Sequence, residues 1–347
     1  MEDSTHPHSQ EPVRVSQRTI ALKLGISVGT VSMALRNHPR IQPSTREQVQ
    51  RMAKEMGYQA VPALQSLANY SRTKRKSSKF TRLGWVNTWQ QPDQLLKHPE
   101  YGAYWEGAHK AASAMGYQLI EFQLGTKLTC VEFRRQLRRQ GISGLLLPPD
   151  GMLLPEDFPW KQYHTVCLSH RRESSSNHLV APDRIENVGL ALGTMRKRGY
   201  QRIGFVTDEL PVTIDDKLSA IGFFNAQSEL PEKDRLPVFT TREGTSNGEL
   251  ADWIKLHQPD AILSDLPDAA RLLEQARIKV PHQVGLASSA LASNAAETGV
   301  DPNGKEIGRA GIELLKGMID GFVQPEIRLR ISIKGYWREG DTLPERG

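Results

Sequence analysis

The sequence predicts an amino-terminal three-helix domain of the helix-turn-helix type, followed by a larger α/β body of two lobes. Two short amphipathic segments flank a glycine at residue 25, and strands alternate with helices from residue 82 onward. Residues 1–80 hold 13 Lys and Arg against 5 Asp and Glu, a balance of +8, whereas the remaining residues hold 32 against 34, or −2. This asymmetry is typical of a nucleic-acid-binding head on a neutral body.

The helix-turn-helix domain is expected at residues 14–60. Gly25 stands where a chain reversal needs positive φ, and Ser27 can cap the second helix. The inward faces of the first two helices are predicted to comprise Ile20, Ala21, Leu22, Leu24, Val28, Val31 and Leu35. The outward face of the second helix comprises Gly29, Thr30, Ser32, Met33 and Arg36. Small, polar and basic residues at the start of a capped helix suit insertion into the major groove of DNA.

A third helix completes this small core. Ser44 and Glu47, which follow Pro43, have the spacing of a capping box, and Gly57 is predicted to end the helix. The buried stripe of the helix is predicted to comprise Val49, Met52, Ala53 and Met56.

Residues 61–80 are expected to form a short hinge helix and a basic linker. Pro62 suits the first position of a helix that runs to Asn69. At about eight residues this helix is too short to be stable alone, so we expect it to form when DNA holds it. The linker at residues 71–79 is strongly basic, and its charges can add phosphate contacts.

The body is expected at residues 81–340. Strands are predicted at 83–86, 118–122, 143–147, 165–168, 178–181, 202–206, 237–240, 261–264, 284–287 and 327–333. Helices are predicted at 101–115, 131–139, 185–197, 217–228, 250–256, 268–276 and 305–320. This alternation implies parallel strands with right-handed crossovers. The number of strands favours two lobes over one open sheet.

Composition excludes several classes of protein. Cys130 and Cys167 have no metal-ligand spacing and lie in apolar stretches, so we expect them to pack in the core in a reducing compartment. Residues 1–13 lack the features of a signal peptide and are expected to be a disordered tail, and no later stretch could span a membrane. We therefore expect a cytoplasmic protein with no membrane contact, no metal and no cofactor.

The head resembles the LacI/GalR family of bacterial transcription regulators. The matching motifs are Ser27–Ser32, Ala34–Leu35, Pro39–Ile41, Thr45–Val49 and Gly57–Tyr58. The resemblance implies a homodimer on a double-stranded DNA operator, with the second helix in the major groove and the hinge helix in the minor groove. Leu67 falls on the family's wedge position, where an apolar side chain unstacks two base pairs and kinks the duplex.

The resemblance and the outward face of the second helix together suggest roles for individual residues of the head. Base edges are expected to meet Gly29, Thr30, Ser32, Met33 and Arg36, with Val28 against a thymine methyl group. Phosphates are expected to meet Ser27, Asn37, Arg40 and Thr45. Further candidates for DNA contact are Ser16, Arg18, Tyr58, Gln65 and Ala68. The chain departs from the family at Met33, where Arg is usual, and at Ala60 and Val61, where Pro-Asn is usual.

The body also resembles this family, whose core looks like a periplasmic sugar-binding protein. The matching stretches are Gly199–Phe205, Pro259–Ile262, Val280–Pro281, Val284 and Ile307–Arg309. The resemblance implies two lobes joined by three crossings, a ligand cleft between the lobes and a dimer interface. It places the crossings near Ala181, Ala290 and Phe322. A hinged cleft of this kind can couple ligand binding to the separation of two DNA heads.

The small-molecule effector is the least defined partner. Candidate effector-binding residues are Asn87, Trp89, Tyr101, Tyr104, Asp183, Lys217, Ser219 and Asp265. Trp85 lies beside them in sequence, although an aromatic residue on a first strand is more often part of the core. Ser219 stands where relatives carry Arg, and Ala290 where they carry Asp. Either the ligand differs from common sugars and purines, or the cleft is closed and the protein regulates without an effector.

The sequence favours a sequence-specific repressor of transcription, and three other classes of protein fit it less well. An enzyme is weakly supported, because the chain has no Gly-x-Ser-x-Gly elbow, His-Glu-x-x-His motif, phosphate-binding glycine loop or cysteine cluster. His164 and His170 flank Cys167 but are interpreted as structural neighbours on a strand. A periplasmic binding protein would not need the basic head. An architectural DNA-binding protein with an inert body is the remaining alternative.

Overall fold

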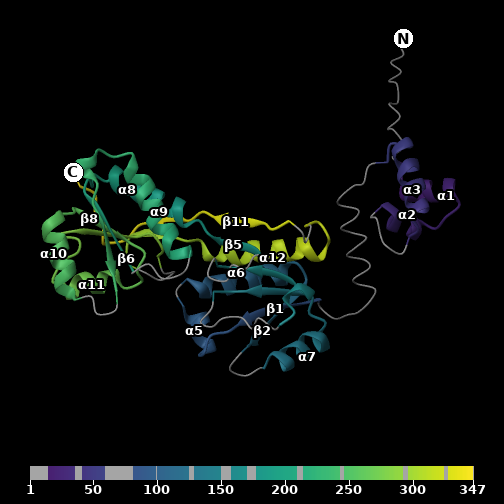
Figure 1. Cartoon of the computed structure of the whole chain (residues 1–347), viewed down its shortest axis with the longest axis horizontal. Helices are drawn as coiled ribbons and strands as arrows, with labels where there is room; N and C mark the ends of the chain where they lie inside the picture. The colour runs from purple at the N-terminus through teal and green to yellow at the C-terminus, as the bar shows by residue number, and fades with distance from the viewer. Residues whose placement is uncertain are drawn as a thin grey trace, which may run out of the picture. The chain divides into compact units, whose positions relative to one another are not determined.

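The computed structural model describes residues 15–35, 41–58, 81–98, 100–124, 129–149, 158–169, 177–208, 214–242, 246–291, 296–323 and 327–346. The chain divides into two compact units, Met1–Ser78 and Lys79–Gly347 (Figure 1). Several predictions lie outside the described residues: the tail, the hinge helix, the basic linker, and the site residues Arg36, Asn37, Arg40, Gln65, Leu67 and Ala68.

The head is a three-helix unit of the predicted helix-turn-helix type. Its helices are α1 (Gln17–Leu24), α2 (Val28–Leu35) and α3 (Pro43–Glu55). Gly25 ends α1 with a φ of 66°, in the left-handed conformation that the sharp turn requires. The buried side chains of the shared core are Ile20, Ala21, Val31, Ala34, Val49 and Ala53.

Three predictions about the head are wrong in detail. Leu22 is 77% exposed and Val28 is 44% exposed. At 100° per residue, Leu22 lies on the opposite side of α1 from Ile20, and the inward stripe of α2 passes through Val31 and Ala34 instead of Val28. The predicted capping box is also absent, because α3 begins at Pro43 and Ser44 lies inside its first turn.

The end of α3 agrees with the prediction. Gly57 follows the helix with a φ of 67°, and the Tyr58 N–H donates to the Ala53 carbonyl at 2.8 Å. This hydrogen bond closes a Schellman motif, which satisfies a carbonyl that the helix end would leave unpaired.

Lobe 1 of the body contains a six-stranded sheet in the order β11-β5-β4-β3-β1-β2. The strands are β1 (Thr81–Asn87), β2 (Tyr117–Gln123), β3 (Gly144–Leu147), β4 (His164–Cys167), β5 (His178–Pro182) and β11 (Arg330–Ile333). The helices are α5 (Pro92–Lys97), α6 (Tyr101–Ala114), α7 (Cys130–Gln140), the 3-10 helix η1 (Trp160–Gln162) and α12 (Gly304–Ile319). Helices α6 and α12 pack on one face of the sheet, and α7 packs on the other.

Lobe 2 contains a second six-stranded sheet in the order β12-β10-β9-β8-β6-β7. The strands are β6 (Ile203–Asp208), β7 (Val238–Thr241), β8 (Ala261–Ser264), β9 (Gly285–Ser288), β10 (Gly299–Asp301) and β12 (Tyr336–Arg338). The helices are α8 (Arg184–Lys197), α9 (Ile214–Ser228), the 3-10 helix η3 (Glu232–Asp234), α10 (Asn247–His257) and α11 (Ala269–Gln275). Helices α8 and α9 pack on one face, and α10 and α11 on the other.

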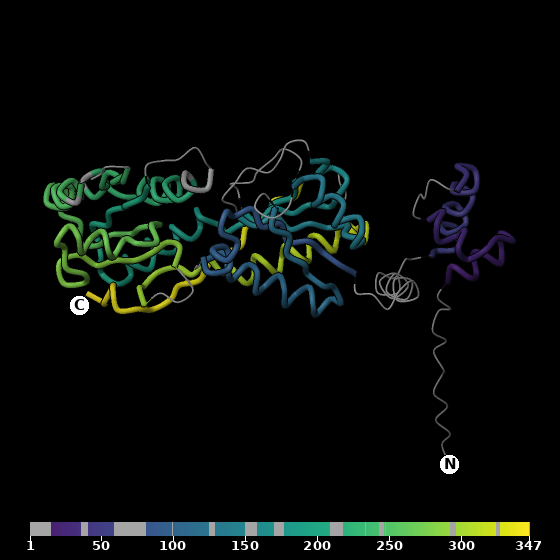
Figure 2. Tube along the Cα trace, turned by 90° about the horizontal axis from the view of Figure 1, so that it is seen from below, coloured from purple at the N-terminus to yellow at the C-terminus, as the bar shows by residue number. Residues whose placement is uncertain are grey.

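The two-lobe prediction is confirmed, and the structure corrects two of the three crossings. The first crossing lies at Asp183, between β5 and α8, close to the predicted Ala181. The second follows β10 and enters α12 at Asn303, and the third lies at residues 334–335, between β11 and β12. The predictions near Ala290 and Phe322 failed because the short strands β10 and β12 were not recognised. In Figure 2 the yellow carboxy-terminal segment contributes to both lobes.

The cysteine prediction holds for one residue only. Cys167 is buried, whereas Cys130 is half-buried at the first position of α7, and both are free thiols. Among the described residues, no group of His, Cys, Asp and Glu could hold a metal ion. In the same part of the chain, no single helix is long and apolar enough to cross a membrane; α1 and α2 would reach that length only as a pair bent by 110°.

Candidate functional site

The start of α2 is an exposed, capped helix end. The Ser27 hydroxyl accepts a hydrogen bond from the Thr30 N–H at 3.0 Å, and the two hydroxyls lie 2.8 Å apart. Val28 and Gly29 are exposed, and Thr30 is half-buried at the rim of the core. A Cβ atom on Gly29 would meet only the Ser27 hydroxyl, at 3.5 Å. Among the described residues, the first turn of α2 is therefore exposed, with Val28 and Gly29 on its surface.

The other described candidates of the head surround this helix end. Ser32 and Met33 are half-buried on α2, and Thr45 is half-buried in the first turn of α3. Ser16 caps α1 by accepting the Thr19 N–H at 3.2 Å, and Arg18 is exposed. The Tyr58 hydroxyl accepts a hydrogen bond from Gln17 Nε2 at 2.9 Å, which ties the end of α3 to α1.

Asn87 and Trp89 lie where the strand order of lobe 1 diverges. Strand β1 pairs with β2 on one side and with β3 on the other, and such a point is where open α/β sheets commonly bind ligands. Asn87 is buried, and its amide donates to the Pro92 carbonyl at 3.0 Å and to Glu121 Oε1 at 2.7 Å. Trp89 Nε1 donates to the Pro149 carbonyl at 2.8 Å, so the indole bridges the ends of β1 and β3.

An aromatic cluster adjoins Trp89 at the start of α6. The rings of His98 and Tyr101 are stacked, with centroids 3.8 Å apart and planes inclined by 10°. The Trp89 ring meets both edge-on, at 6.0 and 6.2 Å. His98 Nδ1 accepts the backbone N–H groups of Glu100 and Tyr101, both at 3.3 Å, and so satisfies donors at the start of α6. The cluster is held in place by its own contacts before any ligand arrives.

Tyr104 belongs to the core of lobe 1 and packs against Tyr101 of this cluster, with the two ring centroids 5.7 Å apart. Its side chain is 1% exposed, and its hydroxyl donates to Glu100 Oε1 at 2.7 Å. Burial raises the pKa of Tyr104 well above the ordinary value, and the negative charge of Glu100 raises it further. Tyr104 is therefore a neutral donor over the whole physiological range. Trp85 belongs to the core and not to a cleft, because it is fully buried in the same hydrophobic cluster.

Asp183, at the crossing into lobe 2, caps a helix and lines a cavity, whereas Ser219 and Asp265 lie farther along the chain in lobe 2. Asp183 caps α8 by accepting the Glu186 N–H at 3.1 Å, and its own N–H donates to the Ile333 carbonyl at 2.9 Å. It lines a cavity of about 160 Å³ with Leu179, Pro182, Arg184, Ile185, Leu218, Arg330, Ile331 and Ser332. Ser219 is buried, and Asp265 is half-buried directly after β8. The side chain of Lys217 lies outside the described residues.

Two family models match the sequence, one in each unit of the chain. A model of bacterial regulatory proteins of the lacI family matches residues 18–60, and a model of a periplasmic binding protein-like domain matches residues 192–339. The chain joins a lacI-family head to a periplasmic binding protein-like body. No curated protein matches the sequence in a separate comparison.

Solved structures of LacI-family regulators share this fold. The complex of the transcriptional regulator CelR with cellobiose is 20% identical, covers 95% of this chain and 100% of its own, and has a TM-score of 0.56. The lac repressor dimer bound to operator and the anti-inducer ONPF is 14% identical, with 95% and 99% covered and a TM-score of 0.54. A putative LacI-family regulator from Rhizobium etli is 16% identical, with 77% and 100% covered and a TM-score of 0.58.

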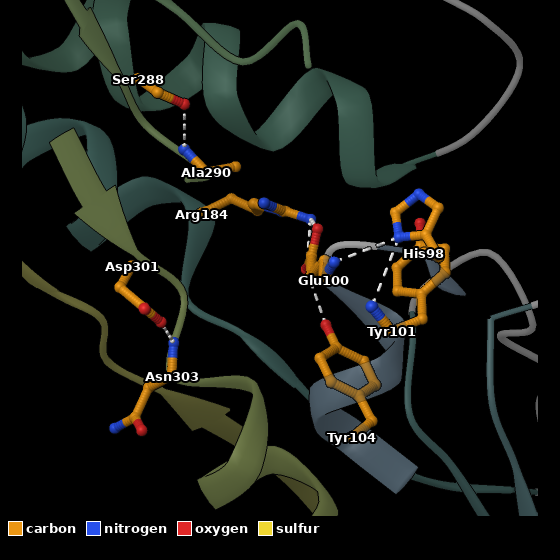
Figure 3. A network of polar contacts seen from close by, with 9 residues as sticks. All are labelled: His98, Glu100, Tyr101, Tyr104, Arg184, Ser288, Ala290, Asp301 and Asn303. Carbon is orange, nitrogen blue, oxygen red and sulfur yellow. Dashed lines mark hydrogen bonds and ion pairs between the residues drawn. The ribbon is translucent and has the colours of Figure 1, made fainter. Parts of the chain in front are cut away.

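Sequence reasoning missed a polar contact between the two lobes of this body. Arg184, at the start of α8, places Nη2 at 2.9 Å from Glu100 Oε1 and 3.1 Å from Glu100 Oε2 (Figure 3). The side chains are 14% and 11% exposed, respectively. The two residues are 84 positions apart and carry no motif, so the sequence held no signal for the pairing. Figure 3 also shows the Ala290 N–H, at the position where relatives carry Asp, donating to Ser288 Oγ at 3.1 Å.

Proposed function

We propose that this LacI-family regulator is a cytoplasmic, homodimeric repressor that binds a pseudo-palindromic operator in double-stranded DNA. The observation that carries the proposal is the open, capped start of α2 on a compact three-helix head, in the part of the chain that holds the surplus positive charge. The dimer is proposed because two heads related by twofold symmetry match an operator made of two half-sites. The lac repressor structure, a dimer bound to operator, supports this arrangement by analogy of fold.

Each candidate of the head takes a role in the proposed complex. Val28, Gly29, Thr30, Ser32, Met33 and Arg36 face base edges, and Ser27, Asn37, Arg40 and Thr45 face phosphates. Ser16, Arg18, Tyr58, Gln65 and Ala68 add further contacts, and Leu67 is the wedge in the minor groove.

Substitution of Met33 by arginine is expected to change the operator half-site. An arginine at this position can donate two hydrogen bonds to guanine, whereas methionine offers only apolar contact. The test is to select binding sites from random duplex DNA with the wild-type chain and with Met33→Arg, and to compare the enriched motifs. We expect an inverted repeat for both chains and a gain of guanine at one position per half-site for the variant. Enrichment of identical motifs would show that Met33 does not read bases, and the absence of any enriched motif would contradict sequence-specific binding.

We also propose that a small, uncharged molecule with an apolar ring face and several hydroxyl groups, such as a sugar, binds between the lobes. The aromatic cluster of Trp89, His98 and Tyr101 offers faces and edges to such a ring, and the Glu100 carboxylate already compensates the charge of Arg184. The other candidate contacts are Asn87, Tyr104, Asp183, Lys217, Ser219 and Asp265. Among proteins of this fold, CelR was solved with cellobiose.

A thermal-shift screen of the full chain with sugars and oligosaccharides tests the effector proposal. A ligand present at 100 times its Kd stabilises the folded state by about 2.7 kcal/mol, because it binds the folded chain and not the unfolded one. For a domain of this size we expect Tm to rise by roughly 5 °C or more. If no member of the panel raises Tm at millimolar concentration, the regulator without a small-molecule effector becomes the better account.

A further inference from the structure

The ion pair of Glu100 and Arg184 joins the two lobes directly. Glu100 occupies the N-cap position of α6 in lobe 1, and Arg184 is the first residue of α8 in lobe 2. A single nitrogen of the guanidinium bonds both carboxylate oxygens, at 2.9 and 3.1 Å. Because both side chains are largely buried, salt and water weaken this attraction less than they weaken a surface ion pair.

The carboxylate is held in position by its own lobe. The Glu100 N–H donates to His98 Nδ1, and the Tyr104 hydroxyl donates to Glu100 Oε1. The His98 ring is itself fixed by its stack on Tyr101. A carboxylate fixed in this way loses little conformational freedom when it meets a partner, which makes the contact stronger than one between two free side chains.

The guanidinium, by contrast, lies at an unfavourable place in lobe 2. The amino-terminal end of a helix carries partial positive charge, which repels a cation in the first turn. Asp183 and Glu186 in the same turn already have partners, since Asp183 caps the helix and Glu186 pairs with Lys334 at 3.4 Å. Separation of the lobes would break the ion pair of Arg184 with Glu100.

The crossings of the body are tied to one another and can serve as a hinge. The Asp183 N–H of the first crossing donates to the Ile333 carbonyl beside the third crossing. The Gly335 N–H of the third crossing donates to Asn187 Oδ1 of α8 at 2.8 Å. A hinge opening about segments tied in this way would separate the ends of α6 and α8 without breaking these hydrogen bonds.

We propose that Glu100 and Arg184 form an intrinsic latch, which holds the two lobes in the arrangement seen here without a bound ligand. The latch bears on the regulation of the proposed effector site, yet it acts within the body and requires neither DNA nor effector. The latch also gives a physical reason why the chain can lack the usual Arg at Ser219 and the usual Asp at Ala290. In a cleft that closes on a ligand, the ligand joins the two lobes. Here the ion pair of Glu100 and Arg184 joins them instead.

Distance measurements between the lobes test the latch. Spin labels are attached at Val131→Cys on α7 and Leu256→Cys on α10, because these side chains are 79% and 76% exposed and lie in different lobes. Cys130 is replaced by serine, and the buried Cys167 is left in place. Labelled full-length chains are diluted into unlabelled ones, so that pulsed electron paramagnetic resonance reports distances within one chain.

We expect a narrow distance distribution for the labelled parent, which keeps Glu100 and Arg184. For Glu100→Gln and for Arg184→Gln we expect a distribution roughly twice as wide, because loss of the ion pair allows an open arrangement of the lobes to be populated. Arg184→Lys, which keeps the charge, is expected to remain close to the parent. Glu106→Gln is the matched control, since it breaks the 2.9 Å pair with Lys305 inside lobe 1, where both side chains are 62% exposed. Its distribution is expected to be unchanged.

The latch is contradicted if both glutamine variants give the parent distribution, or if Glu106→Gln widens it equally. Circular dichroism spectra establish that each variant is folded, and Arg184→Gln decides the matter should Glu100→Gln fail to fold. The distance measurement contains no DNA, so a result that contradicts the latch does not contradict the proposed repressor function. Conversely, a DNA selection that enriches no motif would not contradict the proposed latch.

Discussion

Replacement of Gly29 by aspartate is expected to lower the affinity for the selected operator by about 100-fold or more, because a carboxylate set against phosphates or base acceptors costs several kcal/mol. Gly29 is exposed at the start of α2, and a Cβ there meets nothing closer than Ser27 Oγ at 3.5 Å. The head should remain folded, since an acidic residue in the first turn of a helix is favourable. Electrophoretic mobility shift or fluorescence anisotropy measures the affinity.

Gly29→Asn is the matched control for this charge. Asparagine has nearly the same size and shape as aspartate but carries no charge, so its effect reports the space at the position alone. We expect the asparagine variant to bind clearly better than the aspartate variant, and both to show the circular dichroism spectrum of the wild type. Equal affinities of Gly29→Asp and the wild type would mean that the start of α2 does not face DNA.

Substitution of Gly308 by valine is expected to destabilise the body by about 3 kcal/mol or more, since overpacking against backbone atoms cannot be relieved by a change of rotamer. Helices α6 and α12 approach each other closely at this point. A Cβ on Gly308 would lie 2.0 Å from the Tyr104 carbonyl oxygen and 2.7 Å from the Ala108 nitrogen. The two helices must move apart to admit the side chain, which opens the core beneath Tyr104.

Denaturation monitored by tryptophan fluorescence measures this effect in the full chain, because all six tryptophans lie in the body. Gly189→Ala serves as the comparison, since Gly189 is an exposed residue within α8 and a Cβ there meets no atom within 4 Å. Alanine should raise the free energy of unfolding by roughly 0.5–1 kcal/mol through its higher helix propensity. An unchanged midpoint for Gly308→Val would refute the close packing of α6 on α12.

The helix-turn-helix unit could be predicted because its determinants are local. Gly25 needs the left-handed conformation, Ser27 caps the helix that follows it, and Val31 repeats with its neighbours at helical spacing. Each of these signals lies within one or two turns of the residue that it controls, so tertiary packing has little room to override it. The alternation of strands and helices predicted two lobes for the same reason.

The errors arise where an outcome depends on distant partners. Leu22 looks like a core residue, yet no element in the described part of the head covers its side of α1, and it is 77% exposed. The predicted second and third crossings are wrong because β10 is only three residues long. It is a strand only through its pairing with β9 and β12, which lie elsewhere in the sequence. The pairing of Glu100 with Arg184 depends on the fold of both lobes together, which no short stretch of sequence records.

The stoichiometry of the complex with the selected duplex tests the central claim most directly. Mass measurement by sedimentation or light scattering at moderate ionic strength should give two full-length chains on one duplex, and the enriched site should be an inverted repeat. A single chain on each duplex, or equal retention of unrelated sequences, would contradict a symmetric regulator with two heads on one operator.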